Sequence, residues 1–161
     1  MKKLKSRVNR KTILPKEGEI IQNISIQNIT PFDYIFNLAK DNIIDEINFI
    51  QFAGGAVQYK TLNKLVDKNR VKCINFFMCD FIIKLSAGTK VAVEELANRT
   101  NGVVKYYTNH VKYTLIHVAN NYFVINSTAN AAANIKIEYM EIHNNKEYYD
   151  YLINFIDKNF K

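Results

Sequence analysis

The stretch Glu46–Cys79, EINFIQFAGGAVQYKTLNKLVDKNRVKCINFFMC, contains the pattern that determines the class of fold. It begins with a predicted buried strand, Glu46–Ala53, which is followed by the turn signal Gly54-Gly55. A helix is predicted over about 57–68, where leucine and valine recur at helical spacing. Val71–Cys79 is then a near-continuous apolar strand, of the type that is buried on both faces of a sheet. A strand, a helix and a strand in this order predict parallel strands joined by a crossover helix.

The alternation of strands and helices continues on both sides of this stretch. Upstream, isoleucine alternation predicts a strand over Glu19–Asn28, and Thr30 followed by Pro31 predicts the start of the helix PFDYIFNLAKD. Downstream, the predicted elements are a helix over Lys90–Thr100, strands over Val103–Tyr107, Val111–Val118, Tyr122–Asn126 and Ile137–His143, and a C-terminal helix over about 145–159 with an apolar stripe of Tyr148, Tyr151, Leu152, Phe155 and Ile156. The later strands are expected to be antiparallel and to add to one side of the sheet. We therefore predict an α/β fold with a mixed, mainly parallel sheet flanked by helices.

Length and composition suit one domain of a protein without membrane segments. The chain has 161 residues, of which 48% are apolar, so it can bury a sizeable core. No run approaches the roughly 20 apolar residues that cross a bilayer, and the N-terminus lacks the apolar core of a secretory signal. We expect a cytoplasmic protein with no membrane partner. Cys73 and Cys79 fall about 20 Å apart on one strand, so we interpret them as small core residues rather than a disulfide, unless the strand breaks between them.

The net charge of +7 is concentrated at the N-terminus. Residues 1–16 carry seven basic side chains and no acidic one, which leaves 15 basic and 15 acidic residues in the rest of the chain. We therefore predict a basic arm over residues 1–18 and a folded domain over residues 19–161. Basic arms often contact nucleic acid, although a solvated tail would have the same composition. The arm residues predicted to bind nucleic acid are Lys2, Lys3, Lys5, Arg7, Arg10 and Lys11.

The residues that could take part in catalysis or ligand binding lie between positions 109 and 142. His110 and Lys112 are two apart on a predicted strand, so their side chains emerge on the same face, whereas Val111, Tyr113 and Leu115 point the other way. A polar pair at the start of an apolar strand needs a reason, because an unpaired buried polar group is costly. The polar residues that follow are Ser127, Thr128, Asn130, Asn134 and Glu138. Two strands and one loop thus offer an imidazole, an ammonium, hydroxyls, carboxamides and a carboxylate.

This arrangement resembles the phospholipase D superfamily, which carries H-x-K, a small-residue run that ends in Asn, and a Glu at the start of a later strand. The matching segments are H-V-K at 110–112, S-T-A-N at 127–130 and I-E-Y at 137–139. The spacing of Asn130, Asn134 and Glu138 is similar to that of a single-copy branch found in bacteriophages and mobile elements. The resemblance implies a phospholipase D-like half-enzyme in the cytoplasm of a bacterial host cell, with a phage as one candidate source of the gene. It covers most of the chain beyond the arm.

The resemblance also implies roles for these residues. His110 would attack phosphorus and form a covalent phosphohistidine, and Glu138 would orient and support its imidazole. Phosphate oxygens would be held by Lys112, Thr128, Asn130, Ser127 and Asn134. The leaving oxygen needs a proton from a second histidine. Because the chain has only one H-x-K, that histidine would come from another copy, in a two-fold homodimer through the active-site face.

Two positions depart from the pattern of the superfamily. His117 stands where the family usually has Asp, although strand alternation turns it away from His110 and Lys112. Asn126 and Ser127 stand where a Gly usually precedes the hydroxyl residue. His143 is interpreted as an exposed loop histidine rather than a ligand. With three histidines and no clustered carboxylates, we expect neither a metal site nor a cofactor.

The function predicted from these residues is that of a metal-independent phosphodiesterase, an endonuclease acting on nucleic acid. DNA is favoured over lipid because the chain is small, has a basic arm and lacks an obvious apolar or amphipathic surface segment. Between the two nucleic acids, DNA is preferred to RNA. The alternative is a catalytically degenerate DNA-binding or virion-associated protein on the same fold. A lipid hydrolase is the third possibility, and it would require association with a membrane.

Overall fold

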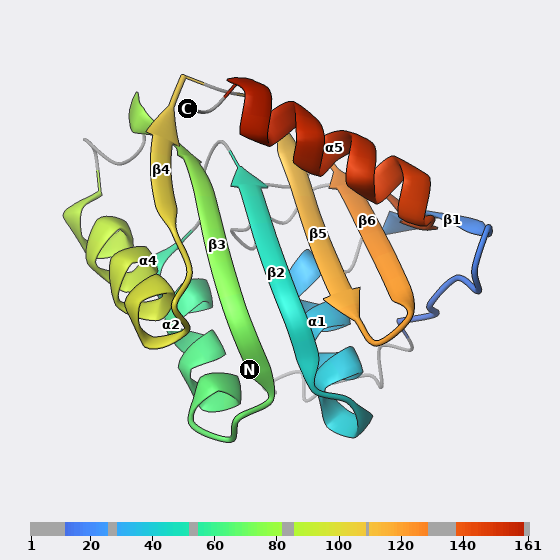
Figure 1. The fold of residues 1–161 in the computed structure, drawn as a ribbon, viewed down its shortest axis with the longest axis horizontal. Coiled ribbons are helices and arrows are strands. Elements are labelled where there is room, and N and C mark those ends of the chain that lie inside the picture. Colours follow the sequence, from blue (N-terminus) through green and yellow to red (C-terminus); the bar gives the residue numbers. More distant parts are fainter. Residues whose placement is uncertain are drawn as a thin grey trace, which may run out of the picture.

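A seven-stranded sheet forms the centre of the described structure, with the strand order β1-β7-β6-β5-β2-β3-β4 (Figure 1). The structure is a computed structural model that describes residues 12–25, 29–51, 55–81, 86–108, 110–128 and 138–159, without the side chains of residues 24, 25 and 138. The strands are β1 Ile20–Ser25, β2 Ile44–Gln51, β3 Val71–Cys79, β4 Val104–Tyr107, β5 Lys112–Val118, β6 Asn121–Ser127 and β7 Glu138–Asn144. The helices are α1 Pro31–Asp41, α2 Ala56–Val66, α4 Ala87–Arg99 and α5 Lys146–Asn159. No described helix is long and apolar enough to cross a membrane.

The sheet is mixed, as predicted, but it is not mainly parallel. Only β2–β3 and β3–β4 are parallel, whereas β1–β7, β7–β6, β6–β5 and β5–β2 are antiparallel. The prediction was wrong because strand and helix alternation does not specify the partner of the first strand. β1 lies at the far edge beside β7 rather than next to β2. The open side of β2 is taken by β5, which runs in the opposite direction.

The larger core lies between one face of the sheet and the helices α1, α2 and α4. Four aromatic rings pack at its centre, and they are Phe32, Phe49, Tyr59 and Phe76. The start of α1 agrees with its prediction, since the Asp33 carboxylate accepts a 2.7 Å hydrogen bond from the backbone N–H of Thr30. The start of α4 differs from its prediction. The side chain of Ser86 accepts a hydrogen bond from the N–H of Thr89, so the helix begins at Ala87, three residues before the predicted start at Lys90.

The opposite face of the sheet is covered by α5, which crosses over β5 and β6 (Figure 1). Its buried side chains are Tyr149, Leu152 and Ile156. The Tyr149 hydroxyl donates to Glu46, 3.1 Å away, and accepts from Asn48, which holds the helix against β2. The predicted stripe was therefore wrong in part, because Tyr151 and Phe155 are 64% and 46% exposed. A helix that lies obliquely over a twisted sheet buries a narrower row than its apolar pattern suggests.

Candidate active site

The residues that begin β5 and end β6 line one open depression of about 440 Å³, at the end of the sheet where these two strands meet. It brings together four of the predicted site residues, namely His110, Lys112, Ser127 and Thr128. They meet because β5 and β6 form a hairpin in which Tyr113 pairs with Asn126, so the residues on either side of that pair are also neighbours. His110 and Thr128 are exposed, Lys112 is half-buried and Ser127 is buried. The combination offers an imidazole, a cation and hydroxyls to one anionic group.

A layer of buried polar side chains lies beneath Lys112. Thr114 is two residues further along β5, and Lys112 pairs in register with Gln51 at the end of β2. Gln51 and Thr114 are 3% and 0% exposed, and both belong to the same side of the sheet as the Tyr59 ring. The sequence analysis missed this layer. The available signal was the polar Thr114 in H-V-K-Y-T, which continues the alternation of His110 and Lys112 into the core.

Thr128 joins the depression to the start of β7. Its backbone N–H donates to the carbonyl oxygen of Tyr139, 3.0 Å away, and its hydroxyl accepts a 3.0 Å bond from the N–H of the same residue. Tyr139 directly follows Glu138, the first residue of β7, which pairs in register with Ser25. The backbone of Glu138 is thus tied to the same end of the sheet as Lys112. The position of Glu138 at a strand start agrees with its prediction, whereas its side chain lies outside what the structure describes.

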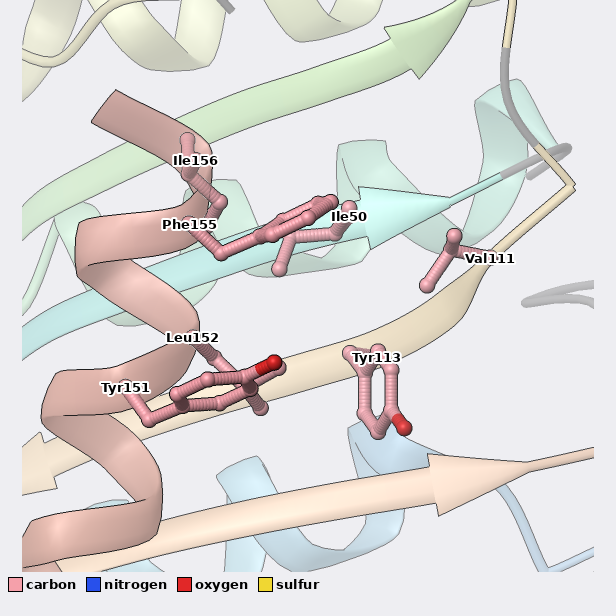
Figure 2. Close-up of a pocket in the computed structure, with 7 residues that line it drawn as sticks. All are labelled: Ile50, Val111, Tyr113, Tyr151, Leu152, Phe155 and Ile156. Atoms are coloured by element: carbon pink, nitrogen blue, oxygen red, sulfur yellow. The ribbon is translucent and has the colours of Figure 1, made fainter. Parts of the chain in front are cut away.

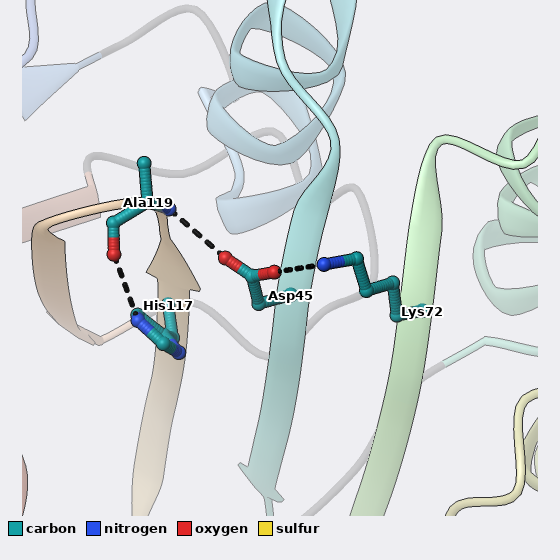
Figure 3. Close-up of polar contacts among 4 residues, drawn as sticks. All are labelled: Asp45, Lys72, His117 and Ala119. Atoms are coloured by element: carbon teal, nitrogen blue, oxygen red, sulfur yellow. Dashed lines mark hydrogen bonds and ion pairs between the residues drawn. The ribbon is translucent and has the colours of Figure 1, made fainter.

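His117 lies on the opposite side of β5 from Lys112. Its ring stacks on Tyr122, with centroids 4.5 Å apart and an interplanar angle of 9°, within the group of side chains that packs under α5. Its Nε2 lies 2.9 Å from the carbonyl oxygen of Ala119, whose N–H donates to Asp45, and Asp45 also pairs with Lys72 (Figure 3). The expectation that His117 faces away from the reactive pair is therefore confirmed. This departure from the family pattern has a structural role at the β5–β6 turn.

His143 is not the exposed loop histidine that was expected. It lies within β7, its side chain is 15% exposed, and its Nε2 contacts the Glu141 carboxylate. Glu141 also accepts a 2.7 Å bond from the Tyr139 hydroxyl, and this bond, together with His143, holds the pKa of Glu141 below its usual range. The ring of His143 packs edge-on against Tyr148. β7 ends one residue beyond its predicted end, and His143 is half-buried because its ring packs against Tyr148 of α5 and lies beside Glu141.

Several predicted site residues lie outside the described part of the chain. These are the arm residues Lys2, Lys3, Lys5, Arg7, Arg10 and Lys11, and the loop residues Asn130 and Asn134. The arm is described only from residue 12 onward. There the carbonyl oxygens of Thr12 and Pro15 accept hydrogen bonds from the side chains of Asn37 and Asn144. Within the described residues, no cluster of three or more His, Cys, Asp and Glu side chains could hold a metal ion.

Comparisons with known proteins identify the fold. No protein family description matches the sequence, and no curated protein sequence does either. Solved structures do match. NucT from Helicobacter pylori is 10% identical with a TM-score of 0.61, and the match covers 87% of this chain and 95% of NucT. Polyphosphate kinase from Porphyromonas gingivalis is 15% identical with a TM-score of 0.61, over 89% of this chain and 26% of the kinase.

A third match is an archaeal chromatin protein, TrmBL2, described as showing a novel mode of DNA binding. It is 13% identical with a TM-score of 0.54, over 89% of this chain and 53% of that protein. Yeast tyrosyl-DNA phosphodiesterase matches at 9% identity with a TM-score of 0.50, over 77% of this chain and 32% of the enzyme. The chain thus spans nearly all of NucT. It spans about half of TrmBL2 and a third or less of the phosphodiesterase and the kinase. The arrangement of sheet and helices is shared with all four.

Proposed function

We propose that this chain, whose fold is that of the phospholipase D superfamily, is a metal-independent phosphodiesterase that cleaves nucleic acid, most simply DNA, as a homodimeric endonuclease. The observation that carries the proposal is the single depression in which His110 and Lys112 meet Ser127 and Thr128. Phosphoryl transfer through a histidine requires an imidazole as the nucleophile, and a cation and hydroxyl groups that stabilise the charge on the phosphate oxygens. The names of two matched proteins, a tyrosyl-DNA phosphodiesterase and a chromatin protein with a mode of DNA binding, favour nucleic acid as the substrate.

In the proposed reaction, an imidazole nitrogen of His110 attacks phosphorus. The P–N bond forms as the P–O bond to the leaving group breaks, and the leaving oxygen takes a proton from the second histidine. Water then attacks the phosphohistidine, gives its proton to that same second histidine, and the P–N bond breaks. Lys112 neutralises the non-bridging oxygens throughout, and Asn130 and Asn134 add donors from the adjoining loop. Glu138 supports the imidazolium form of His110.

The described chain contains one H-x-K segment, so we assign the second histidine to His110 of a second copy. Because each site then needs both subunits, mixing provides a sharp test. Wild-type chains and His110→Ala chains are unfolded together, refolded at varied ratios and assayed for cleavage. In a shared site, activity falls as the square of the wild-type fraction. A linear decrease of activity with the wild-type fraction would assign one complete site to each chain. Full activity in a protein that light scattering shows to be a monomer would do the same.

The test of the activity is cleavage of DNA with EDTA present. We expect wild-type protein to cut, His110→Ala to lose cleavage, and the control His117→Phe to keep it. The control removes a histidine on the other side of β5, and phenylalanine provides a ring that can stack on Tyr122 as His117 does. Equal cleavage by wild type and His110→Ala would refute the role of His110.

A second function, DNA binding without cleavage, is favoured by one specific observation. The hydroxyl of Thr128 is already engaged by the backbone of Tyr139, so it could donate to a phosphate only by giving up its contact with the Tyr139 carbonyl, 3.4 Å away. Wild-type protein that binds DNA but never cuts it would support this alternative, with Lys112 as an anion-binding residue only.

A further inference from the structure

An apolar depression of about 270 Å³ lies on the α5 side of the sheet, next to the candidate active site. Figure 2 shows the side chains that surround it, which come from the ends of β2 and β5 and from α5. Ile50 comes from β2, Tyr113 from β5 and Val111 from the residue directly before β5, and the helix contributes Tyr151, Leu152, Phe155 and Ile156. The rings of Tyr113, Tyr151 and Phe155 thus border this apolar space.

Two of these rings are exposed at the rim. Tyr151 is 64% exposed and Phe155 is 46% exposed, whereas Leu152, between them on the same helix, is 8% exposed. Tyr151 and Phe155 are four residues apart, so they are neighbours along one side of α5. Part of each ring is therefore open to solvent and to a ligand. Aromatic side chains that gather at the edge of an apolar depression mark a binding surface rather than core.

The position of this depression indicates its occupant. Val111 and Tyr113 line both this space and the depression that contains His110 and Lys112. Successive residues of a strand point to opposite faces, so the first residues of β5 present polar groups on one side and apolar groups on the other. A nucleotide has the same division between an anionic phosphate and a flat apolar base. A phosphodiester held at Lys112 would bring its neighbouring base within reach of the aromatic rim.

We propose that Tyr151 and Phe155 form a stacking subsite for an unpaired base of the nucleic acid whose phosphodiester lies at His110 and Lys112. This inference rests on the proposed function, since it takes a nucleic acid as the ligand of that depression. Bases stack on aromatic rings with little dependence on their identity, so the subsite orients the strand without reading its sequence. A base inside a duplex is stacked on its neighbours and would have to leave the helix to enter.

The experiment compares two single-stranded oligonucleotides with the same backbone, an oligothymidine and its fully abasic equivalent. Binding is measured with EDTA by fluorescence anisotropy, using full-length wild type, Tyr151→Ala, Phe155→Ala and the conservative variant Tyr151→Phe. A matched control is Val57→Ala, which trims an exposed apolar side chain on α2, on the other side of the sheet. We expect each alanine variant to weaken oligothymidine binding about 5- to 150-fold, the range that corresponds to the loss of one stacked base. Binding of the abasic strand should not change, and Tyr151→Phe and Val57→Ala should bind both strands like wild type.

Three results would overturn the inference. One is an unchanged affinity of both alanine variants for oligothymidine. Another is an equal loss of affinity for both oligonucleotides, which indicates a general electrostatic or folding defect. The third is a change from dimer to monomer in light scattering, which would assign this surface to the subunit interface. Because the readout is binding, it separates the two proposals. A protein that never cleaves but loses base-dependent affinity in the variants retains the subsite without the activity.

Discussion

Gln51 at the end of β2 donates a 3.0 Å hydrogen bond from its Nε2 to the Thr114 hydroxyl of β5, directly beneath the candidate active site. The amide oxygen of Gln51 accepts a second bond, 3.3 Å long, from the hydroxyl of Tyr59 on α2. All three side chains are buried, and Tyr59 is fully enclosed, so burial raises the pKa of its hydroxyl well above the usual range. These bonds join two strands and a helix next to Lys112, which pairs in register with Gln51 and lines the depression.

Replacement of Thr114 by Val is expected to destabilise the protein by about 1–3 kcal/mol, because the buried Nε2 group of Gln51 loses its acceptor while the shape of the side chain is kept. The measurement is the free energy of unfolding in urea. The triple variant Gln51→Met, Tyr59→Phe and Thr114→Val should recover part of the loss, since it removes the Tyr59 hydroxyl together with the donor and acceptor of this bond. A Thr114→Val protein as stable as wild type would show that the bond contributes nothing.

Asp45 predicts a dependence of stability on pH. Its bond with Lys72, supported by the N–H of Ala119, holds the pKa of the carboxyl below its usual value. Since the folded pKa is the lower one, the contribution to stability is complete above the unfolded pKa of about 3.9 and is lost as the pH falls through the folded value. Asp45→Asn should therefore unfold at a lower temperature than wild type at pH 7, and the gap should close in acid.

The effect of Asp45→Asn is expected to be below about 1 kcal/mol, because the Lys72 side chain is 64% exposed and solvent screens the pair. The control is Asp157→Asn, which makes the same charge change at an exposed position on α5. A gap between wild type and Asp45→Asn that stays constant down to pH 2 would mean that ionisation of Asp45 does not contribute.

Glu138→Gln tests the proposed chemistry most directly. Glutamine keeps the size of the side chain but removes the charge that favours imidazolium and phosphohistidine. We expect turnover to fall on the order of 10²-fold or more, with little change in DNA affinity or melting temperature, since the interaction is made mainly in the transition state. Thermal unfolding and cleavage with EDTA are measured together on wild type and variant. If the variant is destabilised and neither protein cleaves DNA, Glu138 has a structural role only and the proposed catalytic activity is refuted.

The basic arm predicts a salt-dependent contribution to DNA binding. Deletion of residues 1–11 removes the six candidate residues, Lys2, Lys3, Lys5, Arg7, Arg10 and Lys11, but keeps the contacts of Thr12 and Pro15 with the folded part. Each lost phosphate contact should reduce the slope of log K against log salt by roughly 0.9 on duplex DNA. The control keeps the length and replaces the six residues with glutamine, which should have the same effect. An unchanged slope in both proteins would assign the arm to solvent or to another partner.

Local sequence determined those elements whose ends are defined by local chemistry. α1 begins and ends where Thr30, Pro31 and the apolar spacing predicted, and β3 has its predicted bounds because its apolar run is continuous. α4 began earlier than predicted, since Ser86-Ala87-Gly88-Thr89 has the composition of a turn as well as of a capped helix start. The alternation in β5 correctly separated Lys112 from Tyr113 and His117.

Tertiary structure alone decided which strands pair and which aromatic residues of α5 remain exposed. The sequence pattern predicted a strand at 19–28, but only packing placed it beside β7, because any strand edge offers the same backbone groups to any partner. Likewise, the period of α5 grouped Tyr148, Tyr151 and Phe155 with the buried side chains, but the angle of the helix on the sheet buried Tyr149 instead. Periodicity specifies that a helix has an apolar side. How much of that side is covered depends on the surface that it meets, and in this protein the exposed residues Tyr151 and Phe155 form the aromatic rim of the apolar depression.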